Sequence, residues 1–478
     1  IAMAAVLRDR FGIGPGDRVA IAAANSPEHA LAMWAVLFAG ATVASLNGWW
    51  TSPELAYGVG LVEPRLVLAD PTRLGRLRAT DLRPTVLTLE LAALVALAAG
   101  VDGGDPSAFV PVDNSPDDAA AILFTSGTTG RPKAATLTHR NIVHYVWASL
   151  LMGALAGSPV VPEAGPQPAT MATSPMFHLS GLMAVLLTGP VRGTRLVFAP
   201  PGRWDPTDHL RLSAEHGVTT WGGVPTQYWR LLHHPDLGRH DLSALQSVGV
   251  GGAAMAPELI RALRDRLSGV RVSGAYGMTE TVGLGTRVDL DDLMVHSTAV
   301  GEPMPTVELQ IRDAGGRVTG EDQIGEIYIR TGSVFAGYWN DAVATTEALG
   351  SDGWYRTGDF GRIVDGRLHV DSRVRDLIIR AGENISPIEI EHRLVEHPLI
   401  RDAAVVGIDD AELGQVVGAA IVLGDGGALT VDDVRAWVGA TLAAFKVPAV
   451  VEFHTTLPVT ETGKVQKHQI TFTARVTP

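Results

Sequence analysis

The chain has no cysteine among its 478 residues, so it can form neither a disulfide bond nor a thioester on a thiol of its own. Long hydrophobic runs are missing as well. The longest, residues 91–99, is far too short to cross a bilayer, and no basic segment with a cleavage site opens the chain. We therefore expect a cytoplasmic protein without a transmembrane segment.

Positive charge is also scarce. The chain has 38 Lys and Arg against 51 Asp and Glu, a formal net charge of −13, which argues against nucleic acid as the main partner. Only four of the 38 basic residues are lysine. In so arginine-rich a chain, a lysine is expected where a compact ammonium acts as a point charge. One lies in a glycine-rich segment and the others lie near the C-terminus: Lys133, Lys446, Lys464 and Lys467.

The length of 478 residues predicts two or three domains, and a content of 46% hydrophobic and 19% charged residues is typical of an ordinary enzyme. Residues 18–24 and 42–46 are predicted strands. Between them, Ser26 caps a predicted helix that Gly40 ends. Strand and helix alternate again over residues 194–221. This alternation predicts an α/β fold of doubly wound parallel sheets covered by helices.

The pattern changes near residue 300. Short strands at residues 307–312, 325–330 and 368–370 predict a small barrel-like or antiparallel layer. Residues 152–169 are rich in Pro, Gly and Ala and are predicted to form a loop. A charged break follows the last of these strands. We predict a large N-terminal domain over residues 1–371 and a smaller α+β C-terminal domain over residues 372–478.

The segment FTSGTTGRPKAATLTH, residues 124–139, follows a predicted buried strand at 119–124 and precedes a predicted helix. Its backbone N–H groups and hydroxyls could surround a polyphosphate, and its lysine could add positive charge. It is not a Walker A loop, because the spacing is G-x-x-G-x-x-K and no Ser or Thr follows the lysine. The candidate phosphate-binding residues are Thr125, Ser126, Gly127, Thr128, Thr129, Gly130 and Lys133.

Three further segments have compositions that core packing does not explain. YGMTE, residues 276–280, offers an aromatic face for a base, a hydroxyl for phosphate and a carboxylate for a metal. GVGGAA, residues 249–254, lets the backbone approach a flat ligand closely. GWYRTGD, residues 353–359, ends in a carboxylate that could bind both ribose hydroxyls. Lys464 lies on a flexible turn far along the second domain.

Each segment has an ordinary alternative. Residues 249–254 also match a dinucleotide fingerprint, but no acidic residue lies about twenty positions on, which argues against nicotinamide binding. Tyr276 could pack in a core, and Asp359 could cap a turn. The histidine pairs lack zincin spacing, and no G-x-S-x-G elbow is present. A zinc enzyme and a serine hydrolase are therefore not expected.

Taken together, the order and spacing of these motifs resemble the adenylate-forming (ANL) superfamily of acyl-CoA synthetases, luciferases and nonribosomal-peptide adenylation domains. The resemblance extends over about residues 19–467. It implies the fold of that superfamily, with a C-terminal domain that swings about a hinge near Arg373 and Arg375. It also implies ATP, Mg²⁺ and coenzyme A as cofactors and substrates.

The resemblance assigns roles residue by residue. Residues 125–133 would hold the β- and γ-phosphates, His178 would lie beside the acyl carboxylate, and Glu280 would hold Mg²⁺. Lys464 would bridge carboxylate and nucleotide in the first half-reaction, and Gly382 would lie beside the pantetheine channel. The remaining nucleotide-binding residues would be Gly251, Gly252, Ala253, Tyr276, Gly277, Thr279, Asp359 and Arg373.

The implied function is an acyl-CoA synthetase that forms acyl-AMP and pyrophosphate, then transfers the acyl group to coenzyme A and releases AMP. Amino-acid-activating relatives usually carry an aspartate after the aromatic residue, whereas Leu179 and Ser180 follow His178. An uncharged fatty, branched or aromatic acid is therefore favoured. Three apolar or amphipathic residues could line the acyl pocket or could equally be core: Trp221, Val224 and Tyr228.

Coenzyme A is the expected thiol, because no carrier domain follows Lys467. The alternative within the family is a stand-alone acyl-AMP ligase that loads a carrier protein. Outside the family, a phosphohydrolase would give ADP rather than AMP, and a non-catalytic nucleotide-binding protein is disfavoured by the presence of Lys464, Glu280 and Asp359. The oligomeric state is not fixed by the sequence, and a homodimer is left open.

Overall fold

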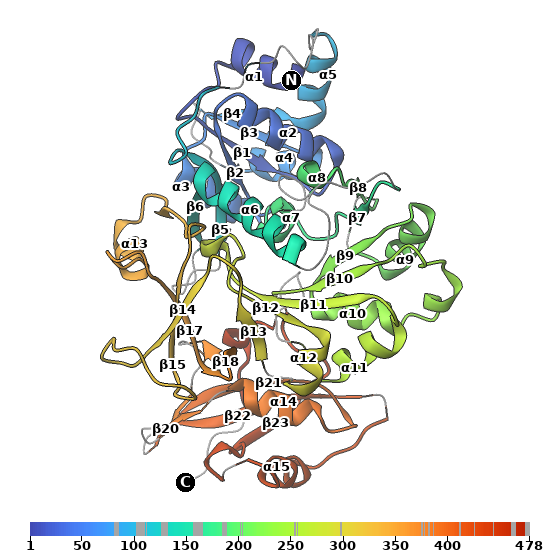
Figure 1. Ribbon diagram of the computed structural model, residues 1–478, viewed down its shortest axis with the longest axis vertical. Helices are drawn as coiled ribbons and strands as arrows, with labels where there is room; N and C mark the ends of the chain where they lie inside the picture. The colour runs from blue at the N-terminus through green and yellow to red at the C-terminus, as the bar shows by residue number, and fades with distance from the viewer. Residues whose placement is uncertain are drawn as a thin grey trace.

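Three β-sheets organise the chain. Figure 1 shows the first near the N-terminus, the second across the middle and the third at the opposite end, near the C-terminus. The computed structural model describes residues 1–80, 86–101, 110, 112–125, 132–155, 166–183, 189–200, 202, 204–252, 255, 257–296, 299–373, 376, 378–380, 383–385, 387–410, 413–424, 426–442, 444–459 and 465–473.

The first sheet has seven strands in the order β16-β6-β5-β2-β1-β3-β4. These strands are β1 (Arg18–Ala22), β2 (Thr42–Ser45), β3 (Leu66–Ala69), β4 (Leu87–Glu90), β5 (Ala119–Thr125), β6 (Lys133–Thr138) and β16 (Gly337–Tyr338). The pairs β1–β2, β1–β3, β3–β4 and β2–β5 are parallel, whereas β5–β6 and β6–β16 are antiparallel. The predicted parallel sheet is thus extended by an antiparallel hairpin and a two-residue edge strand from 200 residues further on.

Helices cover both faces of this sheet because its central strands are apolar on both sides. Val19 and Ile21 of β1 face one core cluster, and the alternate residues Ala20 and Ala22 face another. On the first face lie α1 (Ala2–Phe11), α2 (Pro27–Phe38) and α5 (Leu91–Ala99); on the second lie α3 (Ser52–Val62) and α4 (Pro71–Arg78). Ser26 caps α2, accepting a bond from the His29 N–H, and Gly40 follows it with φ +80°, as the sequence predicts.

The second sheet has eleven strands and combines a parallel with an antiparallel part. The parallel part consists of β7 (Ala169–Met171), β8 (Arg195–Val197), β9 (Thr220–Gly223), β10 (Ser247–Val250) and β11 (Arg271–Tyr276). The antiparallel part adds β12 (Thr286–Asp289), β13 (Ala299–Pro303), β14 (Glu308–Arg312), β15 (Gly325–Arg330), β17 (Tyr355–Val364) and β18 (Arg367–Arg373). This confirms the predicted change of pattern near residue 300.

The helices of the middle region follow the same alternation. They are α6 (His139–Leu155), α7 (Leu179–Met183), α8 (Gly189–Arg192), α9 (Pro206–Glu215), α10 (Pro225–Leu232), α11 (Pro257–Arg266), α12 (Leu290–Val295) and α13 (Ala342–Ala348). The predicted loop at 152–169 is wrong over its first four residues, which continue α6 to Leu155, and at Ala169, which begins β7. Met, Ala and Leu there are good helix formers, and the first proline comes only at position 159.

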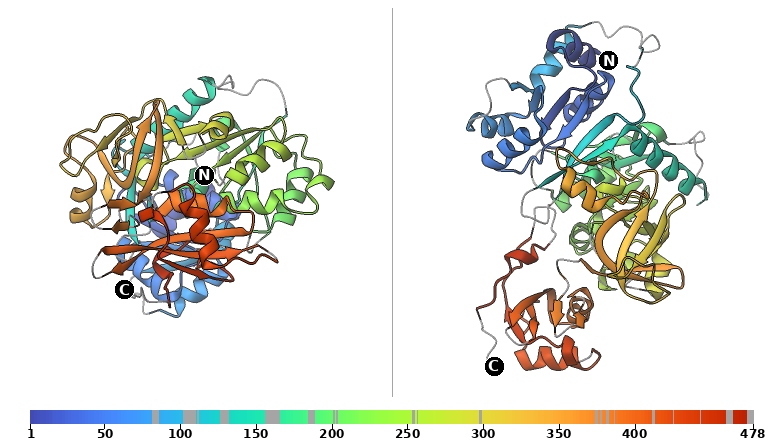
Figure 2. Two further views of the ribbon diagram at one scale, coloured as in Figure 1. Left: turned by 90° about the horizontal axis from the view of Figure 1, so that it is seen from below. Right: turned by 90° about the vertical axis from the view of Figure 1, so that its left-hand side faces the viewer.

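The third sheet has its own hydrophobic core. It consists of β19 (Ile378–Arg380), β20 (Glu383–Ile385), β21 (Ile400–Asp410), β22 (Gly414–Leu423) and β23 (Val450–Phe453), with α14 (Pro387–Val395) and α15 (Val431–Gly439). Figure 2 shows it as the end of the molecule farthest from the N-terminus. The chain changes sheet between the end of β18 at residue 373 and the start of β19 at residue 378, next to the predicted boundary at residue 371.

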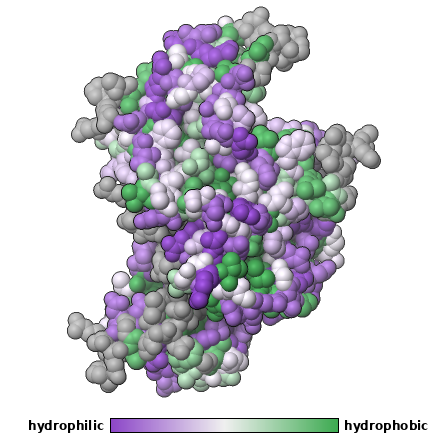
Figure 3. Space-filling model, turned by 60° about the vertical axis from the view of Figure 1, so that its left-hand side comes forward, coloured by the Kyte–Doolittle hydropathy of each residue, from purple (hydrophilic) through white to green (hydrophobic). Residues whose placement is uncertain are grey.

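Within the described residues, none of the helices combines the length and apolar character needed to cross a membrane. The face drawn in Figure 3 mixes hydrophilic and hydrophobic residues.

Two fully enclosed histidines make the stability sensitive to acid. Burial lowers the pKa of His29 to about 4 and that of His209 to about 3. The Nδ1 atom of His29 lies 3.1 Å from the Ala24 carbonyl oxygen, and that of His209 accepts a bond from the Trp204 indole at 3.2 Å. Both Nε2 atoms are buried without a hydrogen-bond partner. A second proton on either ring therefore has no acceptor in the folded state.

We expect the free energy of unfolding to fall as the pH drops from about 6.5 to about 4, by roughly 1 kcal/mol per pH unit for each such histidine. The sign follows because the unfolded chain takes up these protons near pH 6.5, whereas the native imidazoles do not. Urea unfolding at a series of pH values measures it. His29→Gln should flatten the pH dependence, and the exposed His216→Gln should leave it unchanged. Equal slopes for the two variants would contradict this expectation.

Candidate active site

The carboxyl ends of β10 and β11 bring two of the predicted nucleotide segments together. Ligands of open α/β sheets bind at such strand ends. After β10, the Gly251 N–H donates to the Gly223 carbonyl at 3.1 Å. Gly252 has φ +81°, and a Cβ there would lie 3.5 Å from Val224 Cγ1. The backbone can therefore approach a ligand closely here, while Ala253 lies outside the described residues.

Tyr276, the last residue of β11, meets Asp359 of β17. The tyrosine hydroxyl donates to Asp359 Oδ2 at 2.8 Å, and the carboxylate is buried, with its residue 5% exposed. Asp359 pairs with Arg373 across β17 and β18. A side-chain hydrogen bond and a strand pairing thus join three predicted nucleotide-binding positions, although the Arg373 side chain is not described.

Glu280 lies on a short 3-10 helix, η4 (Thr279–Thr281), directly after the Tyr276 segment, and is buried. Its Oε1 accepts a hydrogen bond from the Tyr338 hydroxyl at 2.9 Å, and its backbone carbonyl accepts from the Phe335 N–H at 2.8 Å. Thr279 is half-buried beside it. The predicted metal-binding carboxylate is therefore held by a tyrosine that the sequence analysis did not identify.

Lys133 contacts the ring face of the same tyrosine. It is the first residue of β6 rather than part of a loop leading into a helix, and it pairs with Thr125, the last residue of β5. The predicted phosphate loop thus connects β5 and β6, which pair with each other where the loop begins and ends. Its residues 126–131 lie outside the described part of the chain. The Lys133 ammonium lies 4.9 Å from the centroid of the Tyr338 ring.

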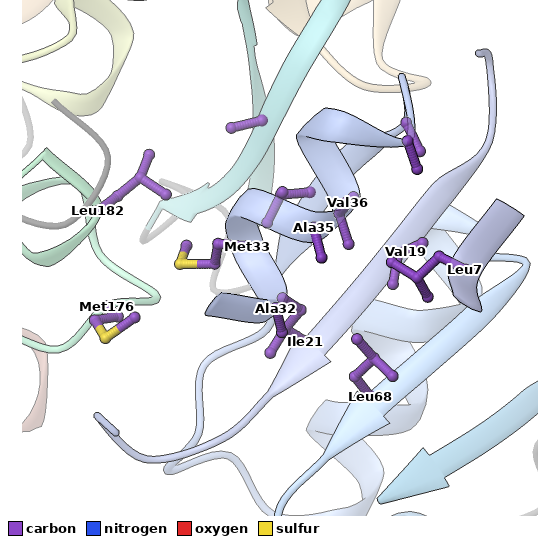
Figure 4. Close-up of a cluster of buried hydrophobic side chains, with 14 of the residues drawn as sticks. Leu7, Val19, Ile21, Ala32, Met33, Ala35, Val36, Leu68, Met176 and Leu182 are labelled. Atoms are coloured by element: carbon purple, nitrogen blue, oxygen red, sulfur yellow. The ribbon is translucent and has the colours of Figure 1, made fainter. Parts of the chain in front are cut away.

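His178 lies in a turn that Asn25 holds. The Asn25 amide donates to the Ala172 and Ser174 carbonyls at 2.9 and 2.7 Å, and its oxygen accepts from the Met176 N–H at 2.8 Å. Figure 4 shows Met176 and Leu182, on either side of His178, beside Met33 of α2, in the cluster to which all three belong. The turn is therefore fixed to the first sheet.

The surroundings of His178 are aromatic. The ring centroids of Phe177 and Trp49 lie 4.8 and 6.2 Å from that of the imidazole. Burial lowers the pKa of His178 to about 4, so the ring is neutral at physiological pH. Its segment also reaches the Glu280 segment, because a Cβ on Gly283 would lie 3.5 Å from both Leu179 and Met183. The turn that carries His178 and the loop that carries Glu280 thus pack against each other.

The loop between Tyr276 and Glu280 depends on glycine at position 277. A Cβ there would lie 2.3 Å from the Gly283 carbonyl oxygen, a backbone atom that cannot move aside alone. We expect Gly277→Ala to lower the free energy of unfolding by about 2 kcal/mol or more and to displace the side chains of Tyr276 and Glu280. Urea unfolding measures the loss. Gly60→Ala is the control: this exposed glycine of α3 has nothing within 4 Å of its Cβ position, and alanine should stabilise the helix slightly. Equal unfolding midpoints would contradict the steric argument.

The three candidates for the acyl pocket differ in their surroundings. Trp221 is completely buried, and its indole N–H donates to Ser213 Oγ at 2.9 Å, which favours the packing alternative for this residue. Tyr228 is also buried, and its hydroxyl donates to the Gly249 carbonyl at 2.7 Å. Val224 is half-buried and lies next to Gly252. Val224 is the best placed of the three to face a ligand, and the pocket remains a prediction.

Two of the C-terminal lysines have carboxylate partners within the third-sheet region. Lys446 bonds both oxygens of Glu389 at 2.6 and 2.8 Å, and Lys467 lies 2.7 Å from Glu391. Lys464, Arg375 and Gly382 lie outside the described residues, and their roles stay predictions. On either side of residues 460–464, Val459 and Val465 pair in an antiparallel bridge.

The chain is similar to known proteins over most of its length. The family model described as "AMP-binding enzyme" matches residues 2–339, and the "AMP-binding enzyme C-terminal domain" model matches residues 389–464. The chain is 32% identical to a feruloyl-CoA synthase of an Amycolatopsis species, over 96% of this chain and 89% of that protein. It is 30% identical to the mouse mitochondrial medium-chain acyl-CoA ligase ACSF2, over 96% of this chain and 79% of that protein. The crystal structure of ATP-bound MatB from Rhodopseudomonas palustris is similar with a TM-score of 0.86, at 32% identity, covering 98% of this chain and 90% of that one.

Proposed function

This chain belongs to the AMP-binding enzyme family, and from that premise we propose that it is an AMP-forming acid–coenzyme A ligase. The observation that carries the proposal is the convergence of two polar pairs from distant segments. Tyr276 bonds Asp359 at the end of β11, and Tyr338 bonds Glu280 beside Lys133. The Tyr276–Asp359 pair suits a nucleoside, and the Tyr338–Glu280 pair together with Lys133 suits its phosphates.

In the proposed reaction, a carboxylate oxygen of the acid attacks the α-phosphorus of ATP. The bond to the pyrophosphate oxygen breaks, and acyl-AMP forms. The thiolate of coenzyme A then attacks the acyl carbon, and AMP leaves. Because the chain has no cysteine, the thiol must come from outside. Lys133 and Lys464 would offset negative charge on the phosphates and on the reacting carboxylate, and the domain that carries Lys464 would swing about residues 373–375 between the steps.

Mg²⁺ would arrive with the nucleotide. Among the described residues no group of three or more His, Asp or Glu could hold a metal by itself. Mg²⁺ does not need such a group, because it commonly binds one or two carboxylates together with substrate phosphates and water. Glu280 fits this role as a buried carboxylate next to the Lys133 end of the predicted phosphate loop. The metal would neutralise phosphate charge during the displacement.

The surroundings of His178 favour an uncharged acyl group. A neutral imidazole next to Phe177 and Trp49 offers no charge to an ammonium or a second carboxylate. Leu179 follows where amino-acid-activating relatives usually carry an aspartate. The printed names of the two relatives refer to an aromatic acid and to medium-chain acids. We propose a fatty, branched or aromatic acid as the substrate.

Pyrophosphate release from ATP with a panel of short, medium, long and aromatic acids, with and without coenzyme A, tests this function. We expect acid-dependent release, AMP as the nucleotide product, and a coenzyme A thioester of the preferred acid. AMP without a thioester would instead support an acyl-AMP ligase that loads a carrier protein. ADP as the product would overturn the adenylation proposal.

A further inference from the structure

Tyr338 touches both charged groups at the phosphate end of the site. The Lys133 ammonium lies over its ring at 4.9 Å, a distance at which a cation is attracted to an aromatic face. Its hydroxyl donates to Glu280 Oε1 at 2.9 Å. One phenol therefore has a cation on its face and an anion at its edge.

The backbone and the neighbouring rings hold this phenol in place. Tyr338 belongs to β16, which pairs with β6 so that Tyr338 lies opposite Ala135. Its N–H donates to Thr345 Oγ1 at 2.9 Å, and the Phe335 ring meets its ring at 4.8 Å, edge to face. The same Phe335 ring meets the ring of Tyr355 at 5.6 Å, edge to face. The position of the ring is thus set by contacts that involve neither charged group.

The chemistry of the site explains why such a spacer matters. A lysine and a glutamate in a partly buried site attract each other strongly, because little water screens them. If they paired, the ammonium would be less available to phosphate and the carboxylate less available to a phosphate-bound cation.

We propose that Tyr338 is a positioning residue that keeps Lys133 and Glu280 apart, so that the two charges do not neutralise each other before ATP with Mg²⁺ binds. The inference rests on the proposed function and adds a role to a residue that the motifs do not include. It predicts that the effect of losing the Tyr338 hydroxyl depends on Lys133. Without the hydroxyl, Glu280 turns toward the ammonium, and the two charges neutralise each other.

The test is a double-mutant cycle with Tyr338→Phe, Lys133→Met and the double variant. Isothermal titration calorimetry measures the affinity for ATP with Mg²⁺, and circular dichroism checks the fold. Tyr338→Phe keeps the ring but loses the donor, so we expect the Kd to rise about tenfold. In the Lys133→Met background, the same change should alter the Kd less than twofold, because no ammonium remains to capture Glu280. In steady state, Tyr338→Phe should raise KM for ATP much more than it lowers kcat.

Tyr355→Phe is the matched control, since it removes the hydroxyl of another tyrosine that packs on Phe335 but leaves the bond from Tyr338 to Glu280. Its Kd should stay within twofold of the wild type. An equal rise in Kd in both backgrounds would show that the hydroxyl acts without Lys133 and would overturn the inference, as would an unchanged Kd in Tyr338→Phe. Failure of the wild-type enzyme to bind ATP with Mg²⁺ would instead overturn the proposed function.

Discussion

Replacing Lys464 with alanine is expected to slow acid-dependent pyrophosphate release by a factor on the order of 10² to 10³, the usual cost of removing one group that stabilises charge in a transition state. The second half-reaction should be nearly unaffected, because the role proposed for the lysine is confined to the step in which carboxylate and ATP react. Supplying the acyl-adenylate of the preferred acid together with coenzyme A isolates that step. Rapid-quench measurement of AMP and thioester gives both rates in the same protein.

Lys467→Ala is the control for this experiment. Lys467 lies three residues further on and pairs with the half-buried Glu391 at 2.7 Å, so its loss should lower the melting temperature. Both half-reactions should then fall together, in step with the folded fraction. If Lys464→Ala reduced the two half-reactions equally, the assignment of Lys464 to adenylation would be wrong.

The second large effect is expected at Asp359. Asp359→Asn should raise KM for ATP by about 10- to 100-fold, because hydrogen bonds that a ribose hydroxyl donates to a charged carboxylate are among the stronger ones. Steady-state kinetics at saturating acid and coenzyme A measure this change. The value of kcat should change less, since the ribose does not take part in bond making.

Substrate analogues separate a ribose contact from a structural defect. With 2′-deoxy-ATP the wild type should lose affinity, whereas Asp359→Asn should lose little more. Tyr276→Phe removes only the partner of Asp359 that lies at 2.8 Å and keeps the aromatic face, so its effect should be smaller. A variant that discriminates against 2′-deoxy-ATP as strongly as the wild type would show that Asp359 does not bind the ribose.

Local sequence patterns predicted many of the elements well. The predicted strand at 325–330 coincides with β15, and the helix predicted between Ser26 and Gly40 is α2. Both have strong local signals, with β-branched and aromatic residues in the first and a proline at the first helical position in the second. The α/β class followed from the spacing of such elements.

Contacts between distant segments could not be predicted in this way. Lys133 was assigned to a loop because six small and polar residues precede it, whereas it pairs with Thr125 as part of a hairpin. Nothing in the residues around Tyr338 indicates that its hydroxyl reaches Glu280, 58 positions earlier. Such contacts depend on three-dimensional placement, which a single sequence does not encode in any local periodicity. The motif residues predicted the kind of ligand. The side chains that hold those residues in place, such as Tyr338 at Glu280, could be identified only in the folded structure.

The edge strand β16 has a consequence for how the protein is made. It completes the sheet to which Lys133 belongs, yet it is translated about 200 residues after β6. At ordinary elongation rates of roughly 5 to 20 residues per second, a ribosome needs on the order of 10 to 40 seconds to produce it. During that interval the nascent chain presents the outer side of β6 unpaired, and such an edge can recruit strands from other chains. Slowing translation between codons 139 and 337 should therefore increase aggregation, whereas slowing it after codon 350 should not.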